Sequence, residues 1–250
     1  AGSADMLGLS PHAPYSTDPV VYRSAIRTSS RLCTHLAETK DEIRFLRDGT
    51  GPFRDLLEEW GLWDGSFRPP GCSPVRYMQQ LGFFDVHPVF APLLVHVNYL
   101  DDADLDVLAA TRASVVYCPR THAFFGHDPH RYGEMLARGI NVCIGTDSLA
   151  SNDSLSILDE LRHLRSMDKR SGDEVLRRMA TANAGAAFAP WASIGRLQPG
   201  YCADLLGVPL EHAGASDPLE DLLRGASRPS HVFVAGGICG EPARMENQPR

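Results

Sequence analysis

Three histidines and one aspartate, His12, His35, His96 and Asp147, each stand at the end of a short apolar run of the sequence. If these runs are strands of one parallel sheet, their carboxyl ends lie along the same edge, and the four side chains come together there. Imidazole nitrogens and carboxylate oxygens are common ligands of Zn²⁺ and similar ions. The pattern therefore indicates a metal site at one edge of a sheet.

Glu38 follows His35 by three residues in the tetrapeptide His35-Leu36-Ala37-Glu38. A histidine at a strand end and a glutamate just beyond it can face the same cavity, where one binds metal and the other transfers protons. A glutamate is more often a solvated surface charge, and the string alone is not specific. Its position directly after an apolar run favours the functional interpretation.

His96 and Asp147 also have structural interpretations. His96 lies inside an apolar stretch and could be a core histidine whose ring nitrogens are hydrogen-bonded. Asp147 precedes a polar cluster, 148–154, that fits turn formation and helix capping. Function is favoured for Asp147, because a carboxylate at the centre of a barrel needs a partner that offsets its desolvation, and a divalent ion would serve.

The order of elements predicts an α/β fold of the barrel type. Apolar runs alternate with segments of helical periodicity, and polar groups at the carboxyl ends of such strands are typical of a (β/α) barrel. The expected strands are 6–9, 32–34, 93–95, 114–117 and 142–144. The expected helices are 18–30, 40–60 with a break at 49–52, 74–81, 101–112, 154–167 and 175–188.

The last part of the chain has a different character. Residues 203–208 and 231–235 read as short strands that follow a turn-like segment at 195–200. We therefore expect residues 1–192 to belong to the barrel and residues 193–250 to form a small β piece with a tail.

Composition narrows the classes of partner. The formal charge of -7 and the lack of any Lys/Arg run interleaved with aromatics argue against a nucleic-acid polymer as ligand. No apolar stretch approaches the roughly 20 residues that span a bilayer, and the six cysteines form no Cys-x-x-Cys pair. We expect a cytoplasmic protein with reduced thiols that acts on a small molecule, away from membranes, either as a monomer or as a homo-oligomer.

Two loops are candidates for substrate contacts. His12 lies between two prolines, so it cannot sit in a regular helix, and a rigid turn would present it to a substrate. Arg120 and His122 lie on the loop that follows the run 114–117 and are further candidates. A second metal site formed by His122, His127 and His130 is the alternative for that loop.

Four motifs together carry a resemblance. They are Ser-Pro-His-Ala-Pro-Tyr-Ser at 10–16, Thr-His-Leu-Ala-Glu-Thr at 34–39, His-Val-Asn-Tyr-Leu at 96–100 and Gly-Thr-Asp-Ser-Leu-Ala-Ser-Asn at 145–152. In this set and order they resemble the amidohydrolase superfamily, and in particular its cytosine, guanine, S-adenosylhomocysteine and aminodeoxyfutalosine deaminases and its chlorotriazine hydrolases. The resemblance implies a partial TIM-like (β/α)8 barrel, strands four to eight, with a C-terminal piece of a small β-sandwich.

The resemblance also implies an activity and a set of roles. His35 and Asp147 match ligands of one divalent ion, Zn²⁺ in the first place and Fe²⁺ as the alternative. Glu38 matches the proton shuttle, His96 the histidine beside the attacking water, and His12 a substrate-binding histidine, while Asp147 would also accept the proton of that water. The reaction would be hydrolytic deamination of a purine-like or other N-heterocyclic amine, with release of ammonia.

The sequence departs from the family pattern in two places. The family's first barrel strand ends in a His-x-His pair that supplies two more ligands, and no such string occurs here, so we expect a fragment of a longer enzyme that alone has an incomplete metal site. Residues 119–122 read Pro-Arg-Thr-His where many members have Pro-x-Ser-Asn. A dechlorinating or cyclic-amide hydrolase of the same fold, and a non-catalytic remnant or partner subunit, therefore remain alternatives.

Overall fold

The computed structural model describes residues 7–29, 31–85, 90–188 and 193–239. The chain divides into two compact units, residues 1–160 and 161–250. All predicted site residues belong to the first unit, which is therefore described in more detail.

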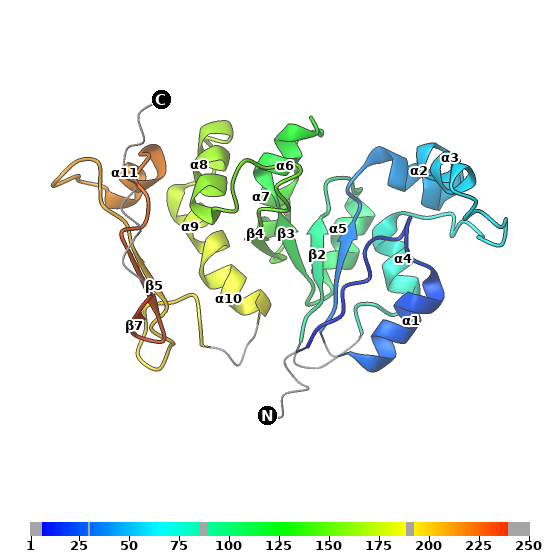
Figure 1. The fold of residues 1–250 in the computed structure, drawn as a ribbon, viewed down its shortest axis with the longest axis horizontal. Helices are drawn as coiled ribbons and strands as arrows, with labels where there is room; N and C mark the ends of the chain where they lie inside the picture. The colour runs from blue at the N-terminus through cyan, green and yellow to red at the C-terminus, as the bar shows by residue number, and fades with distance from the viewer. Residues whose placement is uncertain (1–6, 30, 86–89, 189–192, 240–250) are drawn as a thin grey trace. The chain divides into compact units, whose positions relative to one another are not determined.

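A four-stranded parallel sheet forms the centre of unit 1, with its strands adjacent in chain order (Figure 1). The strands are β1 Cys33–Leu36, β2 Leu93–His96, β3 Ser114–Tyr117 and β4 Asn141–Ile144. Leu36 is registered against His96, and Tyr117 against Ile144, so the carboxyl ends reach one edge. The α/β class and four of the predicted strands are confirmed.

The predicted strand at 6–9 is wrong as a regular strand. Its first residue lies outside the described part of the chain, and Leu9 forms only an isolated parallel bridge with Leu32. The segment nevertheless continues beside β1, because the amide of His35 donates to the carbonyl of His12 at 2.8 Å. Pro11 has no amide hydrogen to offer a ladder, which explains the irregular pairing.

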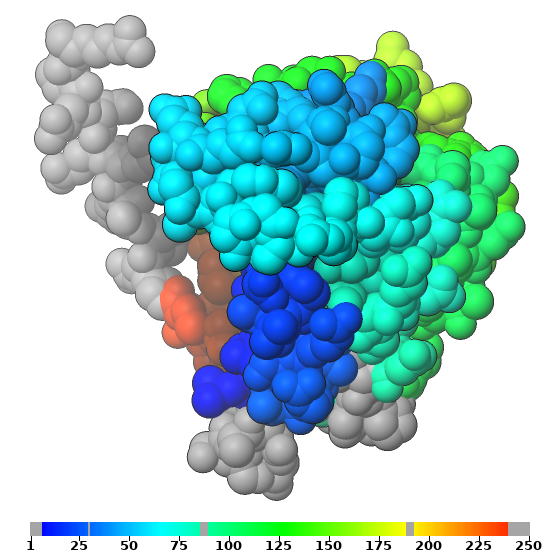
Figure 2. Space-filling view, turned by 90° about the vertical axis from the view of Figure 1, so that its right-hand side faces the viewer, coloured from blue at the N-terminus to red at the C-terminus, as the bar shows by residue number. Residues whose placement is uncertain are grey.

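Helices connect the strands of unit 1 and cover the sheet. They are α1 Pro19–Thr28, α2 Lys40–Asp48, α3 Pro52–Glu59, α4 Pro74–Gln80, α5 Asp102–Ala109, α6 Pro119–Phe124 and α7 Tyr132–Ala137, and α8 Ile157–Met167 runs from unit 1 into unit 2. The break predicted at 49–52 is confirmed, because Gly49 ends α2 with φ 70° and Pro52 begins α3. Figure 2 shows α1 in blue, with α2, α3 and the segment after them in light blue to cyan above it.

Alternation along the strands separates two faces of the sheet. Thr34, Leu94, Val115 and Val142 form one rung across all four strands, and each of them is fully buried. The hydroxyl of Tyr22 on α1 hydrogen-bonds Thr34 at 2.7 Å, so this rung faces the helices. His35 is next in sequence and therefore points to the opposite face.

Unit 2 contains helices and a small antiparallel sheet. Its helices are α9 Asp173–Ala180, α10 Ala182–Phe188 and α11 Pro218–Arg224, and its strands are β5 Leu205–Gly207, β6 His231–Val234 and β7 Gly237–Ile238. The predicted strands at 203–208 and 231–235 are confirmed, whereas the helix predicted at 175–188 is divided at Thr181. No helix in the described ranges is both long and apolar enough to cross a membrane.

Gly145, the first residue after β4, has no room for a side chain. A Cβ there would lie 2.6 Å from Cγ1 of Val116 and 3.2 Å from Sγ of the buried Cys118. We expect Gly145→Ala to lower the free energy of unfolding by about 1–3 kcal/mol through overpacking, as measured by urea denaturation. Gly133→Ala on α7 is the control: nothing lies within 4 Å of its Cβ, so stability should hold or rise. Equal stability of the two variants would contradict this packing argument.

Candidate active site

Four predicted site residues meet at the carboxyl edge of the parallel sheet. His35 Nδ1 lies 3.0 Å from His96 Nε2. The same His96 nitrogen lies 3.6 Å from Glu38 Oε1 and 3.9 Å from Asp147 Oδ2. Candidate ligand atoms of Glu38, His96 and Asp147 are all within 4.8 Å of one another. The ends of β1, β2 and β4 therefore supply one cluster, called here the edge cluster: His35, Glu38, His96 and Asp147.

The backbone at these strand ends takes an unusual conformation. Ala37, His96, Val97 and Asp147 have φ values of 51°, 73°, 52° and 57°, in the left-handed region that residues other than glycine rarely occupy. Such residues cost on the order of 1–3 kcal/mol each and concentrate at functional sites. Cross-strand bonds offset part of this cost, since the amide of Val97 donates to the carbonyl of Leu36 at 2.9 Å.

Burial and neighbouring charge set the protonation of the edge cluster. Burial, followed by the effect of His35, lowers the pKa of His96 to about 3. Burial and His12 also lower the pKa of His35. Burial and the negative charge of Asp147 raise the pKa of Glu38. The imidazoles thus favour the neutral form that binds metal, and the pKa of Glu38 is shifted upward, in the direction that favours its protonated form.

The edge cluster fits a divalent cation. The side chains of Glu38 and Asp147 are only 17% and 21% exposed, and among the described residues neither pairs with a lysine or arginine. Two partly buried carboxylates without a balancing charge are unfavourable unless a cation joins them. The donor set of imidazole nitrogens and carboxylate oxygens is one that Zn²⁺ accepts.

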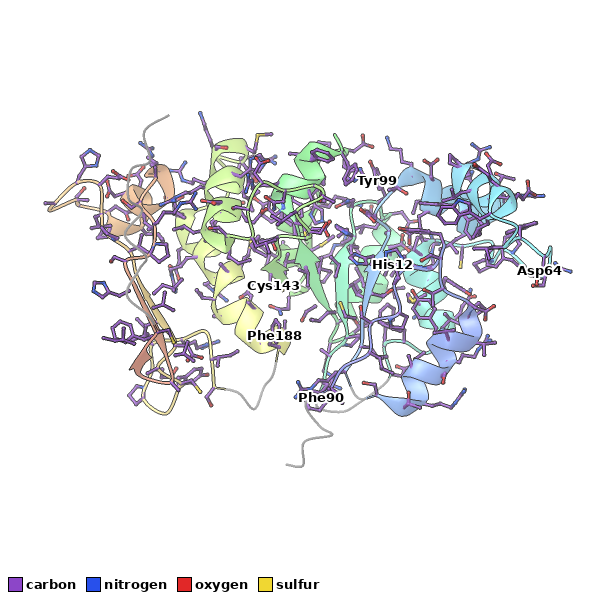
Figure 3. The ribbon with its side chains drawn as sticks, in the orientation of Figure 1. His12, Asp64, Phe90, Tyr99, Cys143 and Phe188 are labelled. Carbon is purple, nitrogen blue, oxygen red and sulfur yellow. The ribbon has the colours of Figure 1, made fainter. Side chains whose placement is uncertain are left out.

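His12 joins this cluster at its exposed side. Its ring centroid lies 5.1 Å from that of His35, and its Nδ1 is 2.6 Å from the hydroxyl of Ser16. Figure 3 labels His12 together with Tyr99, which follows β2 at the carboxyl edge. The position of His12 suits a group that contacts a substrate from solvent.

Arg120 and His122 are held by other contacts. The amide of Arg120 donates to Glu160 at 2.9 Å, and its guanidinium reaches Asp153 and Ser154 in the segment after β4. Nε2 of His122 donates to the carbonyl of Asp128 at 2.8 Å. These hydrogen bonds do not link either side chain to the edge cluster, although His122 lies near enough to His96 to help lower its pKa. The substrate roles of both residues stay predictions.

The alternative metal site on the loop after β3 is not supported by the geometry. The rings of His122, His127 and His130 lie near one another, but each hydrogen-bonds elsewhere: His127 to the hydroxyl of Tyr99, and His130 to the carbonyl of His96 at 2.9 Å. The sequence did not indicate this last contact, because 34 residues separate the partners.

His130 holds the backbone of His96 through a hydrogen bond to its carbonyl. Its ring is half-buried and stacks on Tyr117 with centroids 4.0 Å apart. A carbonyl only accepts hydrogen bonds, so Nε2 of His130 must carry the proton. Burial lowers the pKa of His130 to about 3, which keeps the ring in this neutral donor form.

Comparison with protein-family models gives one match: the amidohydrolase family, over residues 4–239. The chain is 32% identical over 209 residues to a 5-methylthioadenosine/S-adenosylhomocysteine deaminase of Pelotomaculum thermopropionicum, covering 79% of this chain and 42% of that protein. It is 30% identical over 247 residues to a 5'-deoxyadenosine deaminase of Methanopyrus kandleri, covering 92% and 51%. The chain thus spans about half the length of these curated relatives.

Solved structures of similar fold agree with this match. An adenosine deaminase of Xanthomonas campestris with bound zinc superimposes with a TM-score of 0.74 at 22% identity, covering 92% of this chain and 51% of that one. The aminofutalosine deaminase of Helicobacter pylori, in complex with methylthio-coformycin, gives 0.75 at 24%, covering 93% and 57%. A zinc complex of the atrazine chlorohydrolase of Arthrobacter aurescens gives 0.74 at 23%, covering 95% and 51%. At these identities the likeness shows the fold.

His130 should stay neutral in acid while an exposed histidine titrates. An unfolded chain protonates histidine near about pH 6.5, so the lowered pKa of His130 makes folding less favourable as pH falls below that value. At about pH 5, imidazole ¹⁵N shifts should show a neutral His130 with its proton on Nε2. His212, whose pKa is raised by its hydrogen bond to Asp221, is the internal control and should be cationic. A cationic His130 at that pH would rule out its role as a neutral donor.

Proposed function

Because the chain belongs to the amidohydrolase family, we propose that it is part of a metal-dependent aminohydrolase and supplies its proton-transferring residues. The substrate would be an adenosine-type nucleoside or a related N-heterocyclic amine. The observation that carries this proposal is the edge cluster, in which two neutral imidazoles adjoin two carboxylates without a basic partner among the described residues. The names of the relatives, which are deaminases of such nucleosides, support the substrate class.

For the fold, we propose a particular barrel and sandwich in addition to the two sheets described above. Residues 1–192 would supply strands four to eight of a TIM-like barrel, with the irregular segment at Leu9 as the first of these five. Residues 193–250 would belong to a small β-sandwich. The consecutive parallel order of β1 to β4 and the antiparallel sheet of β5 to β7 support two parts of these kinds, whereas the two compact units meet at residues 160 and 161.

His35 and Asp147 would hold one divalent ion, with His96 and Glu38 beside it. Zinc is the preferred ion because proteins of the same fold contain it and the ligand set suits it, with Fe²⁺ as the alternative. When bound, such an ion lowers the pKa of water toward neutrality and so supplies a nucleophile.

The residues of this chain would carry the proton transfers. Asp147 accepts a proton from the attacking water, and Glu38, whose pKa is raised by burial and by Asp147, delivers one to the ring nitrogen next to the reacting carbon. His96 stabilises the charge that develops between them, since its Nε2 lies within 4 Å of both carboxylates. Water and the amine thus give a carbonyl compound and ammonia. His12, Arg120 and His122 would contact the substrate.

The first test replaces the proton carrier in the full-length protein. Glu38→Gln keeps the shape of the side chain but cannot exchange a proton, so ammonia release from 5'-deoxyadenosine should fall about 10²- to 10⁴-fold while metal content is retained. Glu59→Gln, an exposed glutamate on α3, is the matched control and should keep full activity. Unchanged turnover of Glu38→Gln would refute the proton-transfer role. Chloride release from an atrazine-type substrate, in place of ammonia, would favour the dechlorinating alternative.

The second test concerns the metal. Removing one imidazole ligand should cost roughly 10-fold or more in affinity, so purified full-length His35→Ala should contain much less zinc or iron per chain than the native protein. Elemental analysis measures this directly. His212→Ala, on an exposed side chain of unit 2, should keep the native content. Native metal content in His35→Ala would remove this residue from the ligand set.

A further inference from the structure

Glu42 is a buried carboxylate in the first turn of α2. Its side chain is 0% exposed, and among the described residues no lysine or arginine pairs with it. One carboxylate oxygen accepts the amide of Ala37 and the other the amide of Glu38, both at 2.9 Å. Burial raises the pKa of Glu42 to about 8, and the hydrogen bonds from the amides of Ala37 and Glu38 offset only part of that cost.

This arrangement differs from ordinary helix capping. Thr39 is the N-cap of α2, and its hydroxyl accepts the amide of Glu42 at 3.1 Å. In a capping box the glutamate would return to the amide of the N-cap residue itself. Here the carboxylate of Glu42 passes the N-cap and reaches the two residues before it. Glu42 therefore fixes the loop between β1 and α2 as well as the start of α2.

All four backbone polar groups of Ala37 and Glu38 are hydrogen-bonded. Glu42 takes both amides, the amide of Tyr99 donates to the carbonyl of Ala37 at 3.0 Å, and the side chain of Asn98 donates to the carbonyl of Glu38 at 3.1 Å. Ala37 is also one of the left-handed residues, so its conformation persists only while its surroundings hold it. Glu42 supplies half of these restraints.

We propose that Glu42 is a positioning residue that aims Glu38 at the reacting atoms. This inference rests on the proton-transfer role proposed for Glu38. Glu42 holds the peptide before Glu38 through the amide of Glu38, and Asn98 holds the peptide after it through the carbonyl of Glu38, so the Cα between them is fixed. The carboxyl of Glu38 then stays 3.6 Å from His96 Nε2. Without Glu42 two amides would lose their acceptors and the loop would relax from its strained conformation. A shift of about 1 Å in a catalytic group costs roughly 100-fold in rate.

The experiment is a double-mutant cycle on the full-length protein, with kcat for ammonia release from 5'-deoxyadenosine as readout. In the native background Glu42→Ala should lower kcat about 100-fold with little change in KM, because Glu42 acts on the chemical step through Glu38. In the Glu38→Gln background the same change should have no further effect, since the group that it positions is already inactive. Asp41→Asn, an exposed acid in the same turn of α2, should be neutral in both backgrounds.

Glu42→Gln provides a second route if Glu42→Ala does not fold. The amide retains one acceptor oxygen and presents a donor to the other backbone amide, so kcat should fall about 10-fold in the native background only. If either Glu42 variant lowers kcat equally in both backgrounds, Glu42 is merely structural and the inference is wrong. Native turnover of the Glu38→Gln single variant would refute the proposed function itself, whatever the Glu42 variants show.

Discussion

The site depends on the parallel register of β1, β2 and β4 relative to one another. Leu36 is paired with His96, which places His35 and its following loop beside the end of β2. A slip of one residue would turn His35 toward the helices and Thr34 toward the site, because side chains alternate along a strand. The fully buried rung from Thr34 to Val142 resists this slip, since it would expose apolar side chains on one face and bury polar ones on the other.

The strand register brings the side chains of the edge cluster to the carboxyl edge of the sheet, and buried polar groups hold the loops that carry them. Two glutamates act in parallel ways: Glu42 on α2 binds the amides of the loop after β1, and Glu160 on α8 binds the amide of Arg120 and the side chain of Asn152. Asn152 also donates to the carbonyl of Thr146, directly before Asp147. The loops after β1, β3 and β4 are thus each tied to the helix that follows the same or a neighbouring strand.

The sequence predicted those features of the structure that depend on residues close together in the chain. Apolar runs located β1 to β4, glycine and proline at 49–52 located the break between α2 and α3, and residue type at strand ends located the edge cluster. Other features could not be predicted from the sequence. The short helices α6 and α7 were missed, because six residues give little periodicity to detect. The contact between His130 and His96 was missed for a different reason, since it joins segments 34 residues apart. Glu42 resembled an ordinary first-turn acid until the fold showed where its carboxylate points.

Burial without a basic partner bears both on the protonation of the edge cluster and on the cation site that we propose there. Burial lowers the pKa values of His35 and His96 and raises the pKa of Glu38, so the neutral form of each of these three side chains is favoured. A lysine or arginine in this place would favour the ionised form of Glu38 and so oppose the proton-transfer role that we propose for it. On the ligand set that we propose, His35 and Asp147 would hold a divalent ion at one side of the cluster, and Glu38 would remain free to exchange its proton at the other. The lack of basic partners among the described residues around the edge cluster is therefore a requirement of the acid–base chemistry that we assign to it.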